Sequence, residues 1–327
     1  TSPIIILFKT NISQKAIFLF LISLFIFALF IFGNYEINKN KEIKDQTPEK
    51  IYVKIISPNF ELKYGLSKSE IEKRLKNLIR YSDPTKDKKT LFIWPEGVFS
   101  GYSYNEILIF KELILKNFSD KHYIIFGTNN LEPLSGRFYN SMLIVDNELK
   151  IIQSYNKRKL VPFGEFLPFE KFLNYFGLKK ITEGHGSYLK GETDNNLSIE
   201  KLNILPLICY EVIFTDLIQR SASDTNLIIN ISEDGWFGKT IGPDQHFAKS
   251  ILRAIENNTF FLRSTNKGVS AIIDNKGKVI KQLSRNEAGN IEFEVPLIKS
   301  NKIKNDLIFF IFLTTYLFIF LIFREKN

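Results

Sequence analysis

Two long apolar segments, one near each end of the chain, restrict its fold more than any other feature of the sequence. The first runs from Ala16 to Phe32 with Ser23 as its one polar residue, and the second runs from Leu307 to Phe323. A helix of either length reaches about 26 Å, near the short limit for crossing a hydrocarbon core. Neither segment has a polar face, so two buried core helices are the weaker interpretation. The pattern predicts two transmembrane helices.

Basic residues outside these segments predict their orientation. Lys9 and Lys15 precede the first segment, and Arg324 and Lys326 follow the second. Because positively charged flanks stay in the cytoplasm, we expect both termini there and residues 34–306 on the outer side of the membrane.

The beginning of the chain suggests that a larger membrane protein continues upstream. The sequence starts at Thr1 rather than at Met, and Ile4 to Phe8 is typical of the end of another apolar segment. The predicted division is then a segment tail and loop at 1–15, a transmembrane helix at 16–32, a linker at 33–50, one large domain at 51–297, a linker at 298–306, a second transmembrane helix at 307–323 and a cytoplasmic tail at 324–327.

The charge distribution limits the class of partner. The net charge is +9, but lysines are scattered singly among acidic residues rather than gathered in a block. A nucleic-acid groove needs a clustered basic stripe, so we expect no nucleic-acid partner. A modest positive excess instead suits a protein that lies against anionic lipid.

The region between the apolar segments has the pattern of one α/β domain. Capping boxes at Ser67–Glu70 and Ser103–Glu106 each predict a helix start, and a third helix is expected over Asp244–Asn257. Asp274–Gly277 is typical of a hairpin turn. Short apolar runs predict strands at Ile51–Ile56, Thr90–Trp94, Tyr123–Phe126, Met142–Val145, Leu202–Ile208, Leu227–Ile231, Thr259–Leu262, Val269–Ile273, Lys278–Gln282 and Ile291–Val295.

Three segments place a reactive or charged residue after an apolar run. They contain Glu96 in LFIWPEG, Lys157 in YNKRKLVPFGE and Cys209 in ICYE. Strand ends are where α/β sheets assemble sites. A carboxylate base, a thiol nucleophile and an ammonium group that stabilises an oxyanion suffice for acyl transfer. Each residue also has a structural interpretation: Glu96 as a turn residue, Lys157 as a surface lysine and Cys209, the only cysteine, as core.

These segments resemble the Glu-Lys-Cys signatures of the carbon-nitrogen hydrolase (nitrilase) superfamily, and more fully those of the apolipoprotein N-acyltransferase family. The resemblance rests on YNKRKLVPFGEFLPFE (155–170), ICYEVIF (208–214) and the stretch 230–268, and it covers essentially residues 51–297. It implies a nitrilase-like α-β-β-α sandwich. The flanking segments resemble that family's last two membrane helices, and its additional N-terminal helices are missing from this chain.

The resemblance also implies the site. Glu96 matches the general base, Lys157 the oxyanion-stabilising lysine and Cys209 the nucleophile. Further matches, to residues that support the site, are Glu165, Tyr210 and Glu211.

The implied reaction transfers a fatty acyl chain in two steps. A membrane glycerophospholipid would acylate Cys209, and the α-amino group of the diacylglyceryl-cysteine of an apolipoprotein would take the chain from the thioester. No metal or organic cofactor is implied, and we expect a monomer in the bacterial inner membrane with its catalytic domain on the periplasmic side. Two alternatives stay open: a membrane-tethered amidase or nitrilase-type hydrolase with the same triad, and a catalytically inactive scaffold.

Some positions depart from the family pattern. Gly97 follows the glutamate where a small hydroxyl residue is common, Lys159 stands where a histidine is usual, and Tyr64 lies near the place of a frequent tryptophan. The segment Ser57–Asn59 lacks the usual glutamine. These departures concern donor and acceptor preference, and the motif alignment favours Lys157 over Lys159 as the site lysine.

Two further features have open interpretations. His122, His185 and His246 lack metal-ligand spacing, and His246 as the base of a Cys-His hydrolase is less favoured than a local hydrogen-bonding role. The apolar stretch from Phe163 to Phe176 is either a packed loop or, as we favour, a mobile lid that dips into the outer leaflet.

Overall fold

The structure is a computed structural model that describes residues 12–39, 49–169, 172, 175, 186–192, 196–219, 224–300, 310 and 312–317. The chain forms two compact units, Thr1–Pro48 and Glu49–Asn327. Residues 1–11 of the predicted segment at 1–15 lie outside the described residues, as do the predicted tail at 324–327, His185 and Phe176.

The described part of the first unit is one helix. Helix α2 covers Ile12–Lys39 and includes the whole apolar run 16–32. Across the residues that the structure describes, no helix combines the length and the apolar character that crossing a bilayer requires. Most of the second apolar segment lies outside those residues. The two predicted spans therefore gain no support from the structure and remain a prediction.

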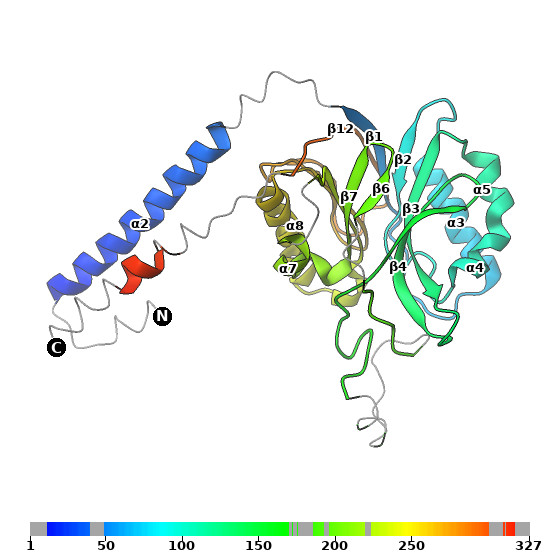
Figure 1. Ribbon diagram of the computed structural model, residues 1–327, viewed down its shortest axis with the longest axis horizontal. Helices are drawn as coiled ribbons and strands as arrows, with labels where there is room; N and C mark the ends of the chain where they lie inside the picture. Colours follow the sequence, from blue (N-terminus) through cyan, green and yellow to red (C-terminus); the bar gives the residue numbers. More distant parts are fainter. Residues whose placement is uncertain are drawn as a thin grey trace. The chain divides into compact units, whose positions relative to one another are not determined.

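The second unit is built on two six-stranded sheets (Figure 1). The first sheet has the strand order β12–β1–β2–β3–β4–β5, and the second has the order β11–β10–β9–β8–β7–β6. The strands of the first sheet are β1 Lys50–Ser57, β2 Thr90–Ile93, β3 His122–Leu131, β4 Phe138–Val145, β5 Ile151–Asn156 and β12 Gly289–Pro296. Those of the second sheet are β6 Leu197–Ile199, β7 Leu202–Ile208, β8 Leu227–Glu233, β9 Phe261–Asn266, β10 Ser270–Ile273 and β11 Val279–Leu283.

The helices cover the outer faces of the two sheets (Figure 1). Against the first sheet pack α3 Lys68–Ser82, α4 Tyr104–Ile107, the 3-10 turn η2 Leu108–Phe110 and α5 Lys111–Asn117. Against the second pack η3 Cys209–Ile213, α7 Thr215–Gln219 and α8 Gly242–Asn257, and η4 Asp234–Phe237 follows β8. The result is the α-β-β-α sandwich that was expected.

Three apolar layers hold the sandwich together. The central layer, between the sheets, contains buried residues of both, such as Ile93 and Ile125 on one side and Ile208 and Ile231 on the other. Alternate residues of the same strands point outward, so Phe92 packs under the helices of its sheet. Each such side chain stabilises the fold by roughly 1.5–3 kcal/mol through the apolar area it removes from water.

Most of the predicted elements are confirmed. The Ser67 capping box opens α3 as expected, and Asp83 in the left-handed region ends it. All ten predicted strands overlap observed ones, but the sequence pattern missed β5 and β6. Both lie at a sheet edge; β5 is half-exposed and β6 has three residues, so neither carries a long apolar run. Strand β9 begins at Phe261 rather than at Thr259 and continues to Asn266.

Candidate active site

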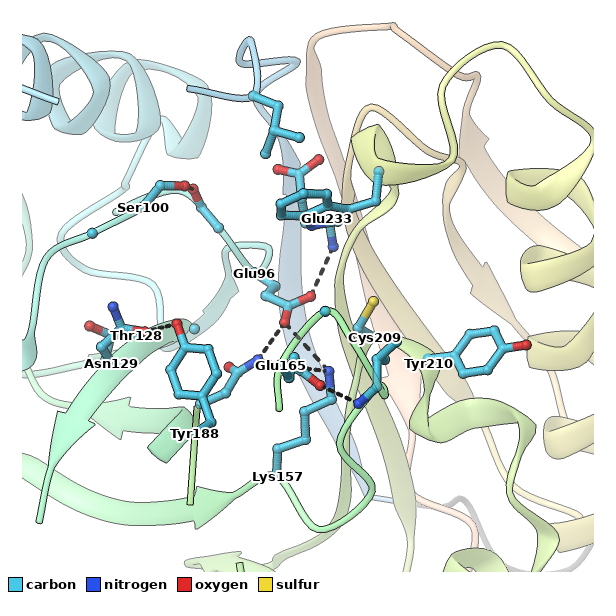
Figure 2. Close-up of a pocket in the computed structure, with 18 of the residues that line it drawn as sticks. Glu96, Ser100, Thr128, Asn129, Lys157, Glu165, Tyr188, Cys209, Tyr210 and Glu233 are labelled. Atoms are coloured by element: carbon cyan, nitrogen blue, oxygen red, sulfur yellow. Dashed lines mark hydrogen bonds and ion pairs between the residues drawn. The ribbon is translucent and has the colours of Figure 1, made fainter. Parts of the chain in front are cut away.

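The predicted site residues meet at one cavity of about 500 Å³. Its walls include Glu96, Lys157, Glu165 and Cys209, and Tyr210 stands at its edge (Figure 2). These residues follow β2, β5 and β7, which come from both sheets. The cavity therefore lies where strand ends of the two sheets approach each other, as the position of these residues after apolar runs predicted.

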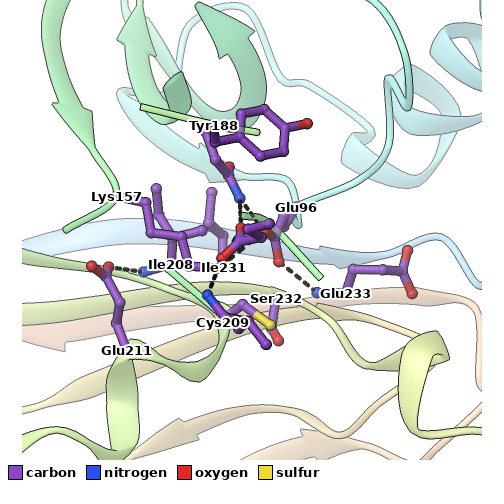
Figure 3. A network of polar contacts seen from close by, with 12 residues as sticks. Glu96, Lys157, Tyr188, Ile208, Cys209, Glu211, Ile231, Ser232 and Glu233 are labelled. Carbon is purple, nitrogen blue, oxygen red and sulfur yellow. Dashed lines mark hydrogen bonds and ion pairs between the residues drawn. The ribbon is translucent and has the colours of Figure 1, made fainter. Parts of the chain in front are cut away.

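Glu96 is held by two donors and lies near a cation. The Asn140 side-chain amide donates to Oε1 at 2.8 Å, and the backbone N–H of Glu233 donates to Oε2 at 3.1 Å (Figure 3). Its Oε1 lies 3.8 Å from Nζ of Lys157. Burial raises the pKa of Glu96, and the Lys157 ammonium opposes that rise. A carboxylate with a raised pKa is a competent proton acceptor near neutral pH.

Lys157 is the cation at the centre of the site. Its side chain is 1% exposed, and Nζ donates to Oε1 of Glu165 at 2.9 Å. Glu165 is itself fixed, because Asn140 donates to Oε1 at 2.8 Å and the Val161 backbone N–H donates to Oε2 at 2.9 Å. Burial alone would lower the pKa of Lys157, but the carboxylates of Glu165 and Glu96 outweigh it and raise the pKa above its usual value. The ammonium therefore stays charged and can stabilise an oxyanion.

The other lysine of this segment lies outside the site. Nζ of Lys159 pairs with Asp216 at 2.8 Å and lies over the ring of Phe214, and its side chain is 34% exposed. Lys159 does not line the cavity. Of the two lysines that the sequence offered, the structure places Lys157 beside Glu96.

Cys209 stands at a sharp turn from strand to 3-10 helix. It directly follows β7 and has a φ of +50°, a left-handed conformation that non-glycine residues seldom adopt. Its carbonyl oxygen accepts from His246 Nε2 at 3.0 Å and from the Asn230 side-chain amide at 3.3 Å. These contacts stabilise a strained backbone of the kind that clusters at functional sites.

The surroundings of Cys209 favour the neutral thiol. Burial raises its pKa well above the usual value, the Glu96 charge raises it further, and the Lys157 charge lowers it. The thiol thus needs a proton acceptor before it can attack a carbonyl. Glu96, which lines the same cavity, is placed to supply one.

His246 contacts the backbone of Cys209. Its Nδ1 lies 3.0 Å from Oδ1 of Asp234, and Arg263 donates to the other oxygen of that carboxylate at 2.8 Å. Burial and the Arg263 charge lower the pKa of His246, whereas Arg263 and His246 outweigh burial and lower the pKa of Asp234 to about 2. The local hydrogen-bonding role expected for His246 is confirmed, and its hydrogen bond goes to the Cys209 carbonyl.

Glu211 lies behind the cavity wall and joins two of the site segments. Its Oε1 accepts from the Tyr155 hydroxyl at 2.9 Å and from the backbone N–H groups of Arg158 and Lys159 at 2.7 and 3.1 Å. Its Oε2 accepts from the Ile208 backbone N–H at 2.9 Å. Burial raises its pKa. One fully buried carboxyl therefore connects the lysine segment to the residue before the thiol (Figure 3).

We expect Glu211→Gln to lower the free energy of unfolding by about 2–4 kcal/mol, because the amide turns its NH₂ toward donors that need an acceptor. Tyr155→Phe removes one of the four donors and should cost about 1 kcal/mol. Urea unfolding of the two variants measures both values. Equal, small losses would contradict the view that Glu211 connects these segments.

Sequence reasoning missed two polar residues of the site. Asn140 lies in β4 and donates to both Glu96 and Glu165, and a polar residue just before the apolar run of that strand was its only signal. Glu233 ends β8, lines the cavity and contacts Glu96 through its backbone. Glu233 follows an apolar strand just as Glu96 and Cys209 do, so the same criterion could have found it.

The departures at Gly97 and Tyr64 have local explanations. Gly97 has a φ of +77°, and a Cβ there would lie 3.0 Å from Oε2 of Glu233. A hydroxyl residue at this position would thus be strained and would crowd that carboxyl. Tyr64 packs on Trp236 with ring centroids 5.7 Å apart, and both rings line the cavity.

The apolar stretch after Lys157 is exposed in part. Phe163, Phe169 and Phe172 are 48%, 85% and 63% exposed, whereas Leu167 is buried. Phe163 and Phe169 both have positive φ values. The described part of the stretch therefore combines a buried leucine with exposed aromatic side chains, and the choice between a packed loop and a lid stays a prediction.

The sequence also matches a known protein family. The sequence profile of the carbon-nitrogen hydrolase family matches residues 62–304. The matched range contains Glu96, Lys157 and Cys209, and it covers most of the sandwich.

The chain is similar to curated proteins that are named apolipoprotein N-acyltransferase. The protein of Rhizobium leguminosarum bv. trifolii is 35% identical over 214 residues, which are 64% of this chain and 40% of the relative. That of Brucella melitensis is 38% identical over 171 residues, covering 52% and 32% of the two chains. That of Rhodopseudomonas palustris is 30% identical over 269 residues, covering 77% and 49%. The chain thus spans between about a third and a half of the length of these relatives.

Solved structures share the fold. A carbon-nitrogen hydrolase of Helicobacter pylori superposes with a TM-score of 0.58 at 13% identity, over 76% of this chain and 90% of that one. Nit3 of Saccharomyces cerevisiae, a member of the nitrilase superfamily, gives 0.53 at 18% identity over 77% and 92%. At these identities the likeness shows the nitrilase-like sandwich alone.

Proposed function

This chain belongs to the carbon-nitrogen hydrolase family, and on that premise we propose that it is an acyltransferase whose Cys209 carries the acyl group as a thioester. One observation carries the proposal: a carboxylate, an ammonium group and a thiol line the same cavity, with the first two 3.8 Å apart. The thiol is neutral beside a carboxylate that can accept its proton.

The proposed substrates are those of an apolipoprotein N-acyltransferase. The donor is a membrane glycerophospholipid, and the acceptor is the α-amino group of the diacylglyceryl-cysteine that begins an apolipoprotein. Support comes from relatives of that name at 30–38% identity. A cavity lined by Phe99, Trp236 and Phe237 beside its polar groups also suits an acyl chain.

In the first half-reaction Glu96 takes the proton of the Cys209 thiol, and the thiolate attacks the ester carbonyl of the phospholipid. Lys157 stabilises the oxyanion that forms. When the oxyanion collapses, the ester C–O bond breaks and Glu96 returns the proton to the leaving alkoxide. The products are the thioester on Cys209 and a lysophospholipid.

In the second half-reaction the neutral amine attacks the thioester carbonyl. The tetrahedral intermediate again places its negative oxygen at Lys157. Glu96 takes a proton from the attacking nitrogen and delivers it to the Cys209 sulfur as the C–S bond breaks. The amide leaves and the thiol is restored, so one base and one oxyanion site serve both steps.

The membrane setting is the part of the proposal that rests on sequence. The apolar segments 16–32 and 307–323 are proposed as spans of an inner-membrane protein, with the sandwich on the periplasmic side. The exposed Phe163, Phe169 and Phe172 would then contact the outer leaflet, which would let acyl chains enter the cavity.

The test is a search for the thioester. The protein in phospholipid vesicles should gain one acyl chain on the peptide that contains Cys209, detected by mass spectrometry and removed by hydroxylamine. The adduct should persist until a diacylglyceryl-cysteine peptide is added, which then becomes N-acylated. Rapid loss of the adduct to free fatty acid without an amine would support the hydrolase instead, and no adduct at all would defeat both.

A further inference from the structure

A third carboxyl in the cavity has no role in the mechanism described above. Glu233 lines the cavity together with Glu96 and Glu165, and its side chain is almost fully buried. In Figures 2 and 3 it lies on the other side of Glu96 from Lys157. Its backbone N–H donates to Glu96, so its position is fixed to that of the proposed base.

The side-chain contacts of Glu233 are all with neutral donors. Oε1 accepts from the Gly235 backbone N–H at 2.8 Å, and Oε2 accepts from the Asn266 side-chain amide at 2.6 Å. Neither contact supplies an acceptor for a carboxyl proton. Because the Glu233 carboxyl also lines the cavity, a group that enters the cavity can pair with it.

Within the described part of the chain, the cations near Glu233 are engaged elsewhere. Arg74 interacts with it electrostatically but donates its hydrogen bonds to the carbonyl oxygens of Glu61 and Val98. Lys267, which approaches Gly235, pairs with the carboxylate of Glu61. None of the ion pairs among the described residues includes Glu233, whereas the Glu165 carboxylate pairs with Lys157.

Burial raises the pKa of Glu233 to about 8. The hydrogen bonds from Asn266 and Gly235 oppose that rise, and the carboxylates of Glu96 and Asp234 add to it. These effects favour the protonated form of Glu233 at neutral pH. An incoming cation would stabilise the carboxylate and release that proton.

The residue opposite this carboxyl packs closely against it. Gly97 has no side chain, and a Cβ at that position would lie 3.0 Å from Oε2 and 3.3 Å from the Glu233 Cβ. Both residues line the cavity. The absence of a side chain at Gly97 therefore lets the Glu233 carboxyl lie close to the backbone that follows the proposed base, at the wall of the cavity.

We infer that Glu233 recognises the primary ammonium group of the acyl acceptor and takes up its extra proton before the amine attacks. This inference rests on the proposed function and gives its second half-reaction a dedicated recognition group. The donor phospholipid reacts through an ester, which has no proton for Glu233 to remove. The residue would thus select amine acceptors over water and alcohols.

Every proton of the acceptor ammonium group is accounted for in this second half-reaction. On binding, the ammonium displaces the Glu233 proton to solvent and pairs with the carboxylate. One N–H proton then moves to Glu233, which leaves a neutral amine. The amine attacks the thioester, and its second proton passes through Glu96 to the Cys209 sulfur. The sum is an ammonium and a thioester giving an amide, a thiol and one proton released to solvent.

The first experiment compares two nucleophiles on the preformed Cys209 thioester. One is a diacylglyceryl-cysteine peptide, whose α-amino group is protonated at pH 7; the other is hydroxylamine, which is neutral there. For Glu233→Gln we expect the ratio of the peptide rate to the hydroxylamine rate to fall at least tenfold. Glu148→Gln, which changes an exposed carboxylate on the turn after β4, should leave the ratio unchanged. An unchanged ratio in Glu233→Gln would overturn the inference.

A second measurement does not require that variant to fold. Isothermal titration calorimetry of the peptide into Cys209→Ala, in buffers of different ionisation enthalpy, should detect about one proton released per peptide bound at pH 7. The N-acetylated peptide should bind at least tenfold more weakly and release none. Equal affinity without proton release would also defeat the inference. Failure to form any thioester would count against the proposed function, and this binding measurement would still report on Glu233.

Discussion

Cys209→Ala is expected to lower acyl transfer by at least about 10³-fold, because in the proposed function both half-reactions pass through the Cys209 sulfur. The fold should persist. The change removes one atom from a half-buried side chain and leaves the His246 and Asn230 contacts to the backbone carbonyl intact. We expect the free energy of unfolding to change by about 1 kcal/mol or less.

Two measurements check this prediction together. Release of lysophospholipid reports the first half-reaction, and N-acylation of a diacylglyceryl-cysteine peptide reports the whole cycle. Urea unfolding confirms that the variant is folded. Transfer at the wild-type rate by a folded Cys209→Ala protein would refute the thioester route, since no other cysteine exists in the chain.

Lys157→Met should have the largest combined effect on stability and activity. It leaves the carboxylates of Glu96 and Glu165 in a buried site without their cation. Breaking a buried ion pair by removing one partner typically costs about 3–5 kcal/mol. Thioester formation should also fall by about 10²-fold or more, because the developing oxyanion loses the positive charge of the Lys157 ammonium that stabilises it.

The neighbouring lysine provides a matched control. Lys159→Met removes the same charge from the same segment, but its ion pair with Asp216 is partly exposed and should contribute less than about 1 kcal/mol. Lys157→Met combined with Glu165→Gln should recover part of the lost stability but none of the activity. Similar losses in the two single lysine variants would show that the ion pairs around Lys157 have no special role.

The sequence predicted the parts of the site that follow long apolar runs. Cys209 directly follows β7, and Glu96 comes shortly after β2. Both strands are buried along their length, so the change from apolar to reactive residue was visible. Lys157 was different. Its strand β5 is half-exposed, and only the family resemblance distinguished it from Lys159.

The contacts between side chains could not be predicted in this way. Asn140 joins Glu96 to Glu165, and Glu211 joins two loops, through pairings that depend on how strands distant in sequence are placed. A sequence pattern reports the period of burial but not which polar atoms meet. The membrane spans were predicted from hydropathy, and the described residues do not support them.

The hydrogen bonds on the Cys209 carbonyl have a consequence for the order of events during turnover. Because His246 and Asn230 hold the backbone at the thiol, Cys209 would keep its position when acylated in the proposed reaction. Donor and acceptor must then occupy the same place in turn. In the proposed reaction the lysophospholipid would have to leave the cavity before the acceptor enters. We therefore expect this exchange, rather than the chemical steps, to limit the turnover rate.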